Sequence, residues 1–238
     1  PEAARNAEGS GLGQARAIQR DISTAYVADM TKYATSADAA KKSHLGSLPS
    51  QLANESNSTK LVWRYVANGA KHASHGASLD WLDAAGLASR CTRITDGRAP
   101  LKALEHPSSF KIYVSDTGLL TCMYDAGPED FAGRDHQTAR FRGGVAENYV
   151  MQQLVALESN RIAGGVQSTY EVEFVARTSA GVVPVEVKSG RHVRSTSAQR
   201  FAEKYDCPYV VRVSGRDFGS AGNVRAIPLY AAGLIPEI

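Results

Sequence analysis

The sequence predicts an α+β protein of two domains, and three features of its 238 residues lead to that prediction. Stretches with helical hydrophobic periodicity are interspersed with short extended stretches. A segment rich in Gly, Pro, Asp and Arg, from Ala126 to Gly144, divides the chain. The order of elements also changes there, from several helices followed by short strands to helix, hairpin, helix and strand.

The composition is that of a water-soluble globular protein. Hydrophobic residues make up 43% and charged residues 21% of the chain, which excludes disordered, collagenous and coiled-coil classes. No apolar stretch approaches the roughly 18 to 20 residues that span a bilayer, and no basic-then-apolar leader opens the sequence. We therefore expect a cytoplasmic protein without a membrane partner. The three cysteines are widely spaced, so we expect reduced thiols rather than disulfides or a metal pair.

The first predicted element is an amphipathic helix over residues 14–33, where apolar residues recur every four positions, at Ile18, Ile22, Tyr26 and Met30. We assign residues 1–35 to a linking segment and this helix. Short helices that Ser36, Ser47 and Ser58 can cap come next, and a helix over residues 77–87 closes the series.

Short strands follow these helices. They are predicted over residues 87–94, 100–104 and 109–114, with Asp-Gly and His-Pro turns between them. Helices that close on a small hairpin indicate a winged-helix-like domain, which we place over residues 36–125. Asp116 or Ser115 then caps a short helix through Met123.

A second domain is predicted over residues 140–238. Its expected elements are a helix over 145–157, strands over 169–175 and 182–188 joined by a turn at 178–181, a helix over 195–204 and a strand over 209–213.

The hairpin of this second domain brings carboxylates together. If its loop pairs Arg177 with Val182, counting back places Glu173 opposite Glu186. The same count places Glu171 opposite Lys188. Like charges directly opposite on a sheet are destabilising, so the arrangement favours a bound cation.

The preceding helix supplies a third carboxylate. Glu147 lies three, four and seven positions before Val150, Met151 and Leu154, so the face that packs on the sheet would carry Glu147 inward. We therefore predict a catalytic group of Glu147, Glu173, Glu186 and Lys188. Glu173 and Glu186 would hold Mg²⁺ or Mn²⁺, Lys188 would stabilise a phosphate or activate water, and Glu147 would complete the outer shell.

A purely structural interpretation stays open beside this one. Glu171 and Lys188 could form a surface ion pair, Glu173 and Glu186 could face solvent, and Glu147 could pair locally. A register slip of one residue would also separate the facing carboxylates.

Basic residues are concentrated after Glu186. Seven basic residues stand against three acidic ones between Glu186 and Arg216, although the net charge of the whole chain is only +3. This local surplus makes a nucleic-acid contact plausible, and DNA is the partner that we expect. The predicted contacts are Lys188, Arg191, Arg194 and Arg200.

Several strings resemble one family. The sequence is similar to the C-terminal region, a domain of unknown function, of bacterial and archaeal AAA/STAND-type ATPases, in which a winged helix precedes a PD-(D/E)XK nuclease-like domain. The matching strings are Pro1–Ala3, Leu48–Ala53, Trp81–Leu87, Phe110–Leu120, Gly144–Val150, Glu171–Val175 and Pro184–Gly190.

The resemblance implies a restriction-endonuclease-like α/β fold with a mixed sheet for the second domain. It also implies that Glu147, Glu173, Glu186 and Lys188 match the family's helix carboxylate, aspartate and ExK positions, with Glu173 standing where Asp is usual. The Arg194–Ser197 stretch likewise departs from the family's Lys next to serines.

The resemblance further implies an ATPase domain as partner. No GxxxxGK[ST] phosphate loop is present, so ATP would bind only to residues outside this chain, and we identify no cofactor-binding residue within it. The leading functional hypothesis is a metal-dependent nuclease, or a nuclease-derived nucleic-acid-binding region, of such an ATPase. The competing hypothesis is a non-catalytic regulatory or protein-docking module, a role that winged helices also serve.

Overall fold

The computed structural model describes residues 11–31, 40–47, 61, 63–133, 135–156, 162–164, 172–189 and 196–237. The α+β prediction is confirmed, because helices surround a mixed sheet. Predictions for Glu171, Arg191 and Arg194, and for the segments around Ser36 and Ser58, lie outside the described residues.

Helices dominate the N-terminal half. Residues 40–47 are also helical, and the named elements are α2 (Leu12–Thr31), η2 (Trp63–Tyr65), α4 (His72–Ala84), β1 (Ala88–Ile94), η3 (Leu101–Leu104), β2 (Glu105–Val114), α5 (Thr117–Met123) and η4 (Pro128–Phe131). The C-terminal half contains most of the strands. Its elements are α6 (His136–Ala156), β3 (Ile162–Gly164), β4 (Phe174–Thr178), β5 (Gly181–Lys188), α7 (Ser197–Lys204), β6 (Val210–Ser214), β7 (Gly219–Ala221), β8 (Val224–Pro228) and η5 (Leu229–Glu237).

The strands follow one another in the order β2-β1-β3-β4-β5-β6-β8-β7. β1 and β2 form an antiparallel hairpin, which joins the remaining strands through a single parallel pair, Arg93 with Gly164. β3, β4 and β5 are antiparallel neighbours, whereas β6 runs parallel to β5 and β8 runs parallel to β6. The carboxyl ends of β5, β6 and β8 therefore lie at one edge of the sheet.

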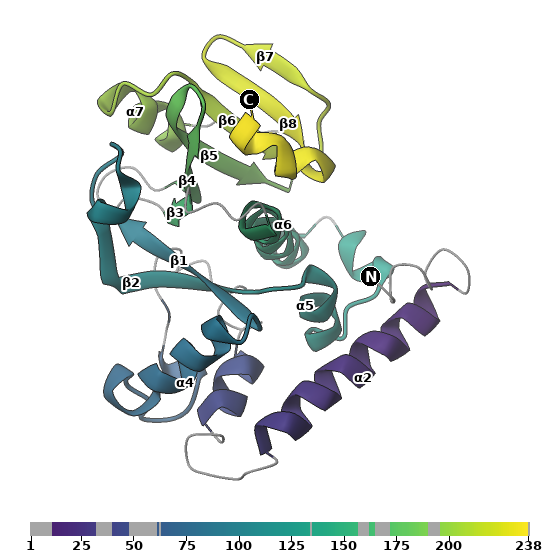
Figure 1. The fold of residues 1–238 in the computed structure, drawn as a ribbon. Helices are drawn as coiled ribbons and strands as arrows, with labels where there is room; N and C mark the ends of the chain where they lie inside the picture. Colours follow the sequence, from purple (N-terminus) through teal and green to yellow (C-terminus); the bar gives the residue numbers. More distant parts are fainter. Residues whose placement is uncertain are drawn as a thin grey trace.

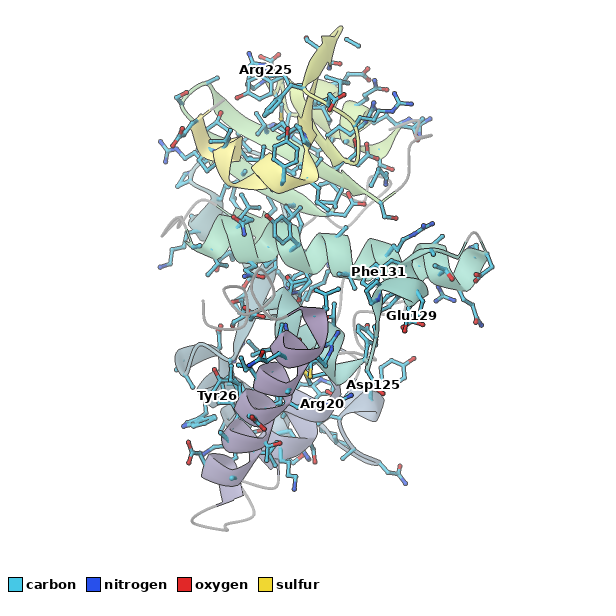
Figure 2. The ribbon with its side chains drawn as sticks, turned by 90° about the vertical axis from the view of Figure 1, so that its right-hand side faces the viewer. Arg20, Tyr26, Asp125, Glu129, Phe131 and Arg225 are labelled. Atoms are coloured by element: carbon cyan, nitrogen blue, oxygen red, sulfur yellow. The ribbon has the colours of Figure 1, made fainter. Side chains whose placement is uncertain are left out.

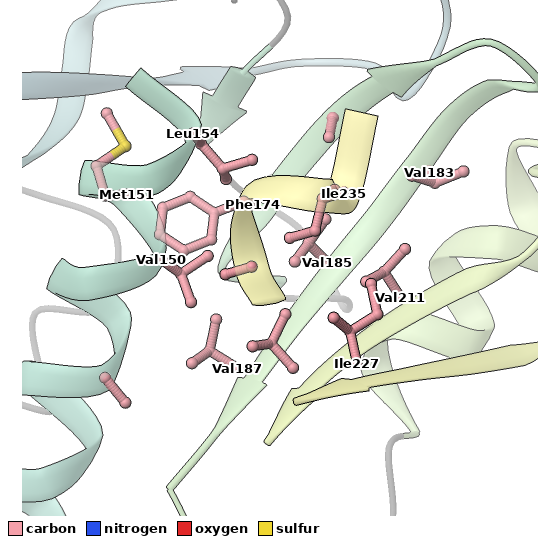
Figure 3. Packing of buried hydrophobic residues seen from close by; sticks show 14 of the residues in the cluster. Val150, Met151, Leu154, Phe174, Val183, Val185, Val187, Val211, Ile227 and Ile235 are labelled. Atoms are coloured by element: carbon pink, nitrogen blue, oxygen red, sulfur yellow. The ribbon is translucent and has the colours of Figure 1, made fainter. Parts of the chain in front are cut away.

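Helix α6 lies between the two halves of the molecule (Figure 1). Its apolar side chains pack on one face of the sheet, where β5, β6, β8 and η5 complete the core (Figure 3). The fully buried side chains of Val150, Leu154 and Phe174 lie in this core. Helix α7 covers the opposite face through Ala198 and Phe201, so the sheet is buried on both sides.

The alternation of strand β2 places its side chains in two different environments. Phe110, Ile112 and Val114 pack with α4 in the N-terminal core, whereas Tyr113 packs in the α6 core. Lys111 lies on the same side of the strand as Tyr113, because alternate residues of a strand share a face. The hairpin thus directs Lys111 and Tyr113 toward α6.

Helix α2 is attached to the chain between α5 and η4. The Arg20 guanidinium lies 2.8 Å from the Asp125 carboxylate, and the Arg16 guanidinium donates a hydrogen bond to the Ala126 carbonyl (Figure 2). This contact holds the first described helix against the segment that leads into α6.

Three predicted elements need correction. Residues 101–104 form the 3₁₀ helix η3 instead of a strand, because a helical turn buries Leu101 in the core beneath α7. The strand predicted over 169–175 begins only at Phe174 and continues to Thr178. The helix predicted from Val145 begins at His136, within the segment that we interpreted as a loop.

The strands β3, β7 and β8 and the helix η5 were not predicted. Among the residues described, no helix combines the length and apolarity that crossing a membrane requires.

His44, in the helical segment 40–47, gives a pH prediction. Its imidazole is completely buried, its Nε2 lies 3.0 Å from the His75 carbonyl oxygen, and burial lowers the pKa from 6.5 to about 4. The unfolded side chain accepts a proton near pH 6.5, whereas the folded one stays neutral until about pH 4. The stabilising contribution of neutral His44 is therefore full above pH 6.5 and is lost as the pH falls toward 4.

We expect the free energy of unfolding to fall between these pH values by up to about 3 kcal/mol through His44 alone. Urea unfolding of the wild type and of His44→Gln across this range measures the difference. A wild-type curve that parallels the variant's curve would contradict the prediction.

Candidate functional site

The β4–β5 ladder brings two glutamates to one end of the hairpin. The predicted pairs of Arg177 with Val182 and of Val175 with Pro184 are confirmed, so the chain adopts the expected register. The ladder ends where Phe174 pairs with Val185, and Glu173 is the residue just before it. Glu173 therefore lies beside Glu186, as the register predicted.

Lys188 connects these two carboxylates. Its Nζ lies 3.3 Å from Glu173 Oε1 and 3.2 Å from Glu186 Oε1. The side chains of Glu173 and Lys188 are 24% and 30% exposed, whereas that of Glu186 is 7% exposed. The structure thus brings together three of the four predicted catalytic residues, and Glu186 is buried instead of facing solvent, whereas Glu173 stays partly exposed.

Arg212 joins the site from the neighbouring strand. The parallel register of β5 and β6 pairs it with Glu186, and its Nε lies 3.6 Å from Glu186 Oε2. Within the described part of the chain, neither this Nε nor this Oε2 has a hydrogen-bond partner. A buried carboxylate oxygen with unused acceptor capacity is a position where a cation or a donor fits.

Glu147 enters the site from α6, and its side chain is only 19% exposed, which confirms its predicted inward direction. Its Oε1 accepts hydrogen bonds from Lys111 Nζ and from the Tyr113 hydroxyl, each at 2.5 Å. We expected Glu147 to converge with Glu173, Glu186 and Lys188 or, in the structural interpretation, to pair locally. Instead, its hydrogen-bond donors come from strand β2 of the N-terminal half.

Asn148, the next residue, fixes α6 against β2. Its side chain is completely buried, its Oδ1 accepts a bond from the Val114 amide at 2.9 Å, and its Nδ2 donates to the Val114 carbonyl at 2.9 Å. Gln152, one turn later, accepts hydrogen bonds from the amide and hydroxyl of Thr117. These contacts set the position at which Glu147 meets Lys111.

The charges of the site act on one another. Burial raises the pKa of Glu173 to about 7; the Lys188 charge opposes this rise, while the charges of Glu147 and Glu186 add to it. Burial by itself would lower the pKa of Lys188 and of Lys111, but the neighbouring glutamates outweigh it and raise both pKa values. Both lysines therefore carry a full positive charge at neutral pH.

The residues fit a divalent cation in part. Carboxylate oxygens are the protein ligands that Mg²⁺ and Mn²⁺ prefer, and the free acceptor of Glu186 is one of them. Across the residues that the structure describes, no three or more His, Cys, Asp or Glu side chains are grouped closely enough to hold a metal ion. Glu173 and Glu186 would be its side-chain ligands, and water or a bound substrate would complete the coordination.

The predicted nucleic-acid contacts are only partly described. Lys188 lies in the site, and Arg200 is exposed on α7, while Arg191 and Arg194 lie outside the described residues.

Sequence reasoning missed Lys111, Tyr113 and Arg212. A signal for Arg212 existed, because alternation on β5 and β6 directs Glu186 and Arg212 toward the same face once the strands are aligned. No local pattern marks Lys111, which meets Glu147 only through the docking of β2 on α6.

Two family models match the chain. The domain of unknown function DUF8612 matches residues 1–130, and the domain of unknown function DUF4143 matches residues 142–232. Comparisons with curated proteins and with solved structures gave no match.

Proposed function

The chain belongs to the DUF8612 family, a family of unknown function, and we propose from the geometry of its site that it is a metal-dependent phosphodiesterase acting on nucleic acid, or a binding region derived from one. The observation that carries the proposal is the Lys188 ammonium between Glu173 and Glu186, at the adjoining ends of two paired strands. Two carboxylates and a lysine in this arrangement suit the hydrolysis of a phosphodiester.

The chemistry follows from the charges. A divalent cation held by Glu173 and Glu186 would supply positive charge for the attacked phosphate and would lower the pKa of an attacking water. Lys188, flanked by two carboxylates, carries a proton and so suits the stabilisation of phosphate charge rather than the removal of a proton. Arg212 holds Glu186 in place from β6.

The architecture supports this proposal. The order α6, three antiparallel strands, α7 and a parallel strand β6 is compatible with the proposed restriction-endonuclease-like domain. The helices before the β1–β2 hairpin are compatible with the proposed winged-helix-like domain.

An ATPase partner is part of the proposal. DUF4143 is commonly found in proteins associated with AAA-type ATPases. We propose that ATP binds to such a partner domain and that the present chain is its DNA-facing portion, with Mg²⁺ or Mn²⁺ as the cofactor.

A non-catalytic regulatory or docking role is the second candidate. The observation in its favour is that Lys188 already pairs with both hairpin carboxylates, while Glu173 has one methylene more than the aspartate expected there. Gel-shift measurements separate the candidates: DNA retention that weakens as salt rises, without cleavage, indicates the nucleic-acid-binding form of the first candidate, whereas neither retention nor cleavage favours the docking role.

Cation binding is tested by thermal stability. We expect Mn²⁺ to raise the melting temperature of the wild type, because a ligand that binds the folded state at about 100 times its Kd adds roughly 2.7 kcal/mol of stability. Glu186→Gln should abolish this rise. Glu203→Gln, which changes an exposed glutamate on α7, should preserve it. A wild type whose melting temperature does not respond to Mn²⁺ would contradict the cation site.

A further inference from the structure

Lys111 is a site residue that comes from the other half of the chain. It lies on β2, within the segment matched by DUF8612, whereas Glu147, Glu173 and Glu186 lie within the segment matched by DUF4143. Its side chain is only 19% exposed, and its ammonium is 2.5 Å from Glu147 Oε1. The site is therefore assembled from both halves.

The charged side chains of this site cancel one another. The three carboxylates of Glu147, Glu173 and Glu186 face three cations. These cations are Lys111 on Glu147, Lys188 between Glu173 and Glu186, and Arg212 on Glu186. A divalent cation held by Glu173 and Glu186 would meet no net negative charge in these surroundings, because each of the three carboxylates already has a counter-ion. Removing one cation would leave the group with a net charge of minus one.

We infer that Lys111 sets the affinity of the site for divalent cations, through the positive charge that it places beside the carboxylates. This inference rests on the cation site of the proposed function. The N-terminal hairpin thus takes part in the chemistry of the C-terminal half, and Lys111 is a positioning and charge-balancing residue rather than a ligand.

The location of Lys111 makes this charge effective. Ion pairs that are largely removed from solvent are screened far less than those on the surface. The ammonium also lies in the field of Glu173 as well as that of its hydrogen-bonded partner, Glu147. Adding or removing one charge here should therefore change the dissociation constant of a divalent cation by about tenfold or more, since the unscreened Coulomb interaction at an effective dielectric constant near 20 exceeds this and solvent and counter-ions reduce it.

The test is a calorimetric titration of the full chain with Mn²⁺ at about pH 8, compared among variants. Lys111→Met should bind Mn²⁺ about tenfold more tightly than the wild type, because it removes a cation. Glu147→Gln should bind about tenfold more weakly, because it removes an anion and keeps the side-chain shape. The double variant should return close to the wild-type affinity, since its charges cancel again. Lys102→Met removes an exposed lysine of η3 and should leave the affinity unchanged.

The Mn²⁺ affinity should rise in Lys111→Met and fall in Glu147→Gln. A merely structural role would not produce these opposite shifts, because loss of packing would weaken Mn²⁺ binding in both variants. If Glu147→Gln fails to fold, tighter binding by Lys111→Met still decides; if Lys111→Met fails to fold, Lys111→Gln removes the same charge and replaces it. Equal affinities throughout, or weaker binding in Lys111→Met, would overturn the inference, and so would the absence of Mn²⁺ binding in every variant. Tight Mn²⁺ binding that follows the expected order, without any cleavage of DNA, would support the role of Lys111 while contradicting the nuclease.

Discussion

The Lys188→Met variant is expected to lose about 100-fold or more of the phosphodiester cleavage that we propose for the wild type. Methionine has a similar length but no charge, so the change removes the ammonium that lies 3.3 Å from Glu173 and 3.2 Å from Glu186. A fixed positive charge directed at the reacting phosphate stabilises the transition state. This electrostatic contribution to the cleavage rate is usually the largest that a single group makes. Cleavage rates under single-turnover conditions measure the loss.

Folding must be controlled in this comparison. Lys188→Met leaves two carboxylates facing each other without their shared cation, so circular dichroism should first show that the variant is folded. Lys102→Met, on the exposed surface of η3, should keep the wild-type rate. A Lys188→Met protein that is folded and cleaves at the wild-type rate would exclude Lys188 from the chemistry.

Replacement of Asn148 by alanine is expected to lower the free energy of unfolding by about 3 kcal/mol. Asn148 is completely buried and satisfies both the amide and the carbonyl of Val114, while its Nδ2 also donates to Thr117 Oγ1 at 3.1 Å. Alanine would leave buried backbone groups without these partners, and each such group costs about 1 to 3 kcal/mol.

Urea unfolding monitored by circular dichroism measures this change. Val155→Ala alters an exposed position of the same helix and should change the free energy by less than about 0.5 kcal/mol. Similar free energies of unfolding for Asn148→Ala and Val155→Ala would show that the hydrogen bonds between Asn148 of α6 and Val114 of β2 contribute little to stability.

The hairpin site could be predicted because its geometry is local. A short turn sets the register of β4 and β5, and alternation then determines which side chains share a face. Glu147 was placed correctly for a similar reason, since the stripe of Val150, Met151 and Leu154 fixes which face of α6 is buried.

The contacts across the two halves could not be predicted. Lys111 and Glu147 are 36 residues apart, and their meeting depends on how β2 docks on α6, which no hydrophobic period encodes. Helix α7 lies between β5 and β6 in the chain, so no short turn fixes the register of these two strands, and the pairing of Glu186 with Arg212 could not be counted from the sequence.

The start of α6 shows how tertiary contacts override local propensity. Glycines at 143 and 144 argue against a helix, since glycine within a helix costs roughly 0.5 to 1 kcal/mol relative to alanine. The aromatic ring of Phe141 nevertheless packs against those of Tyr124 and Phe131, each with ring centroids 5.0 Å apart. Asp135 accepts a hydrogen bond from the Thr138 amide, and this capping signal was readable in the sequence.

The most direct test of the central claim is the cleavage of plasmid and single-stranded DNA by the wild type, with Mg²⁺ or Mn²⁺ and after chelation with EDTA. The matched comparison is Glu186→Gln against Glu203→Gln, purified identically. We predict metal-dependent cleavage by the wild type and by Glu203→Gln, and none by Glu186→Gln. Cleavage that persists in Glu186→Gln, or a wild type that cuts neither substrate with either metal, would contradict the proposed phosphodiesterase site.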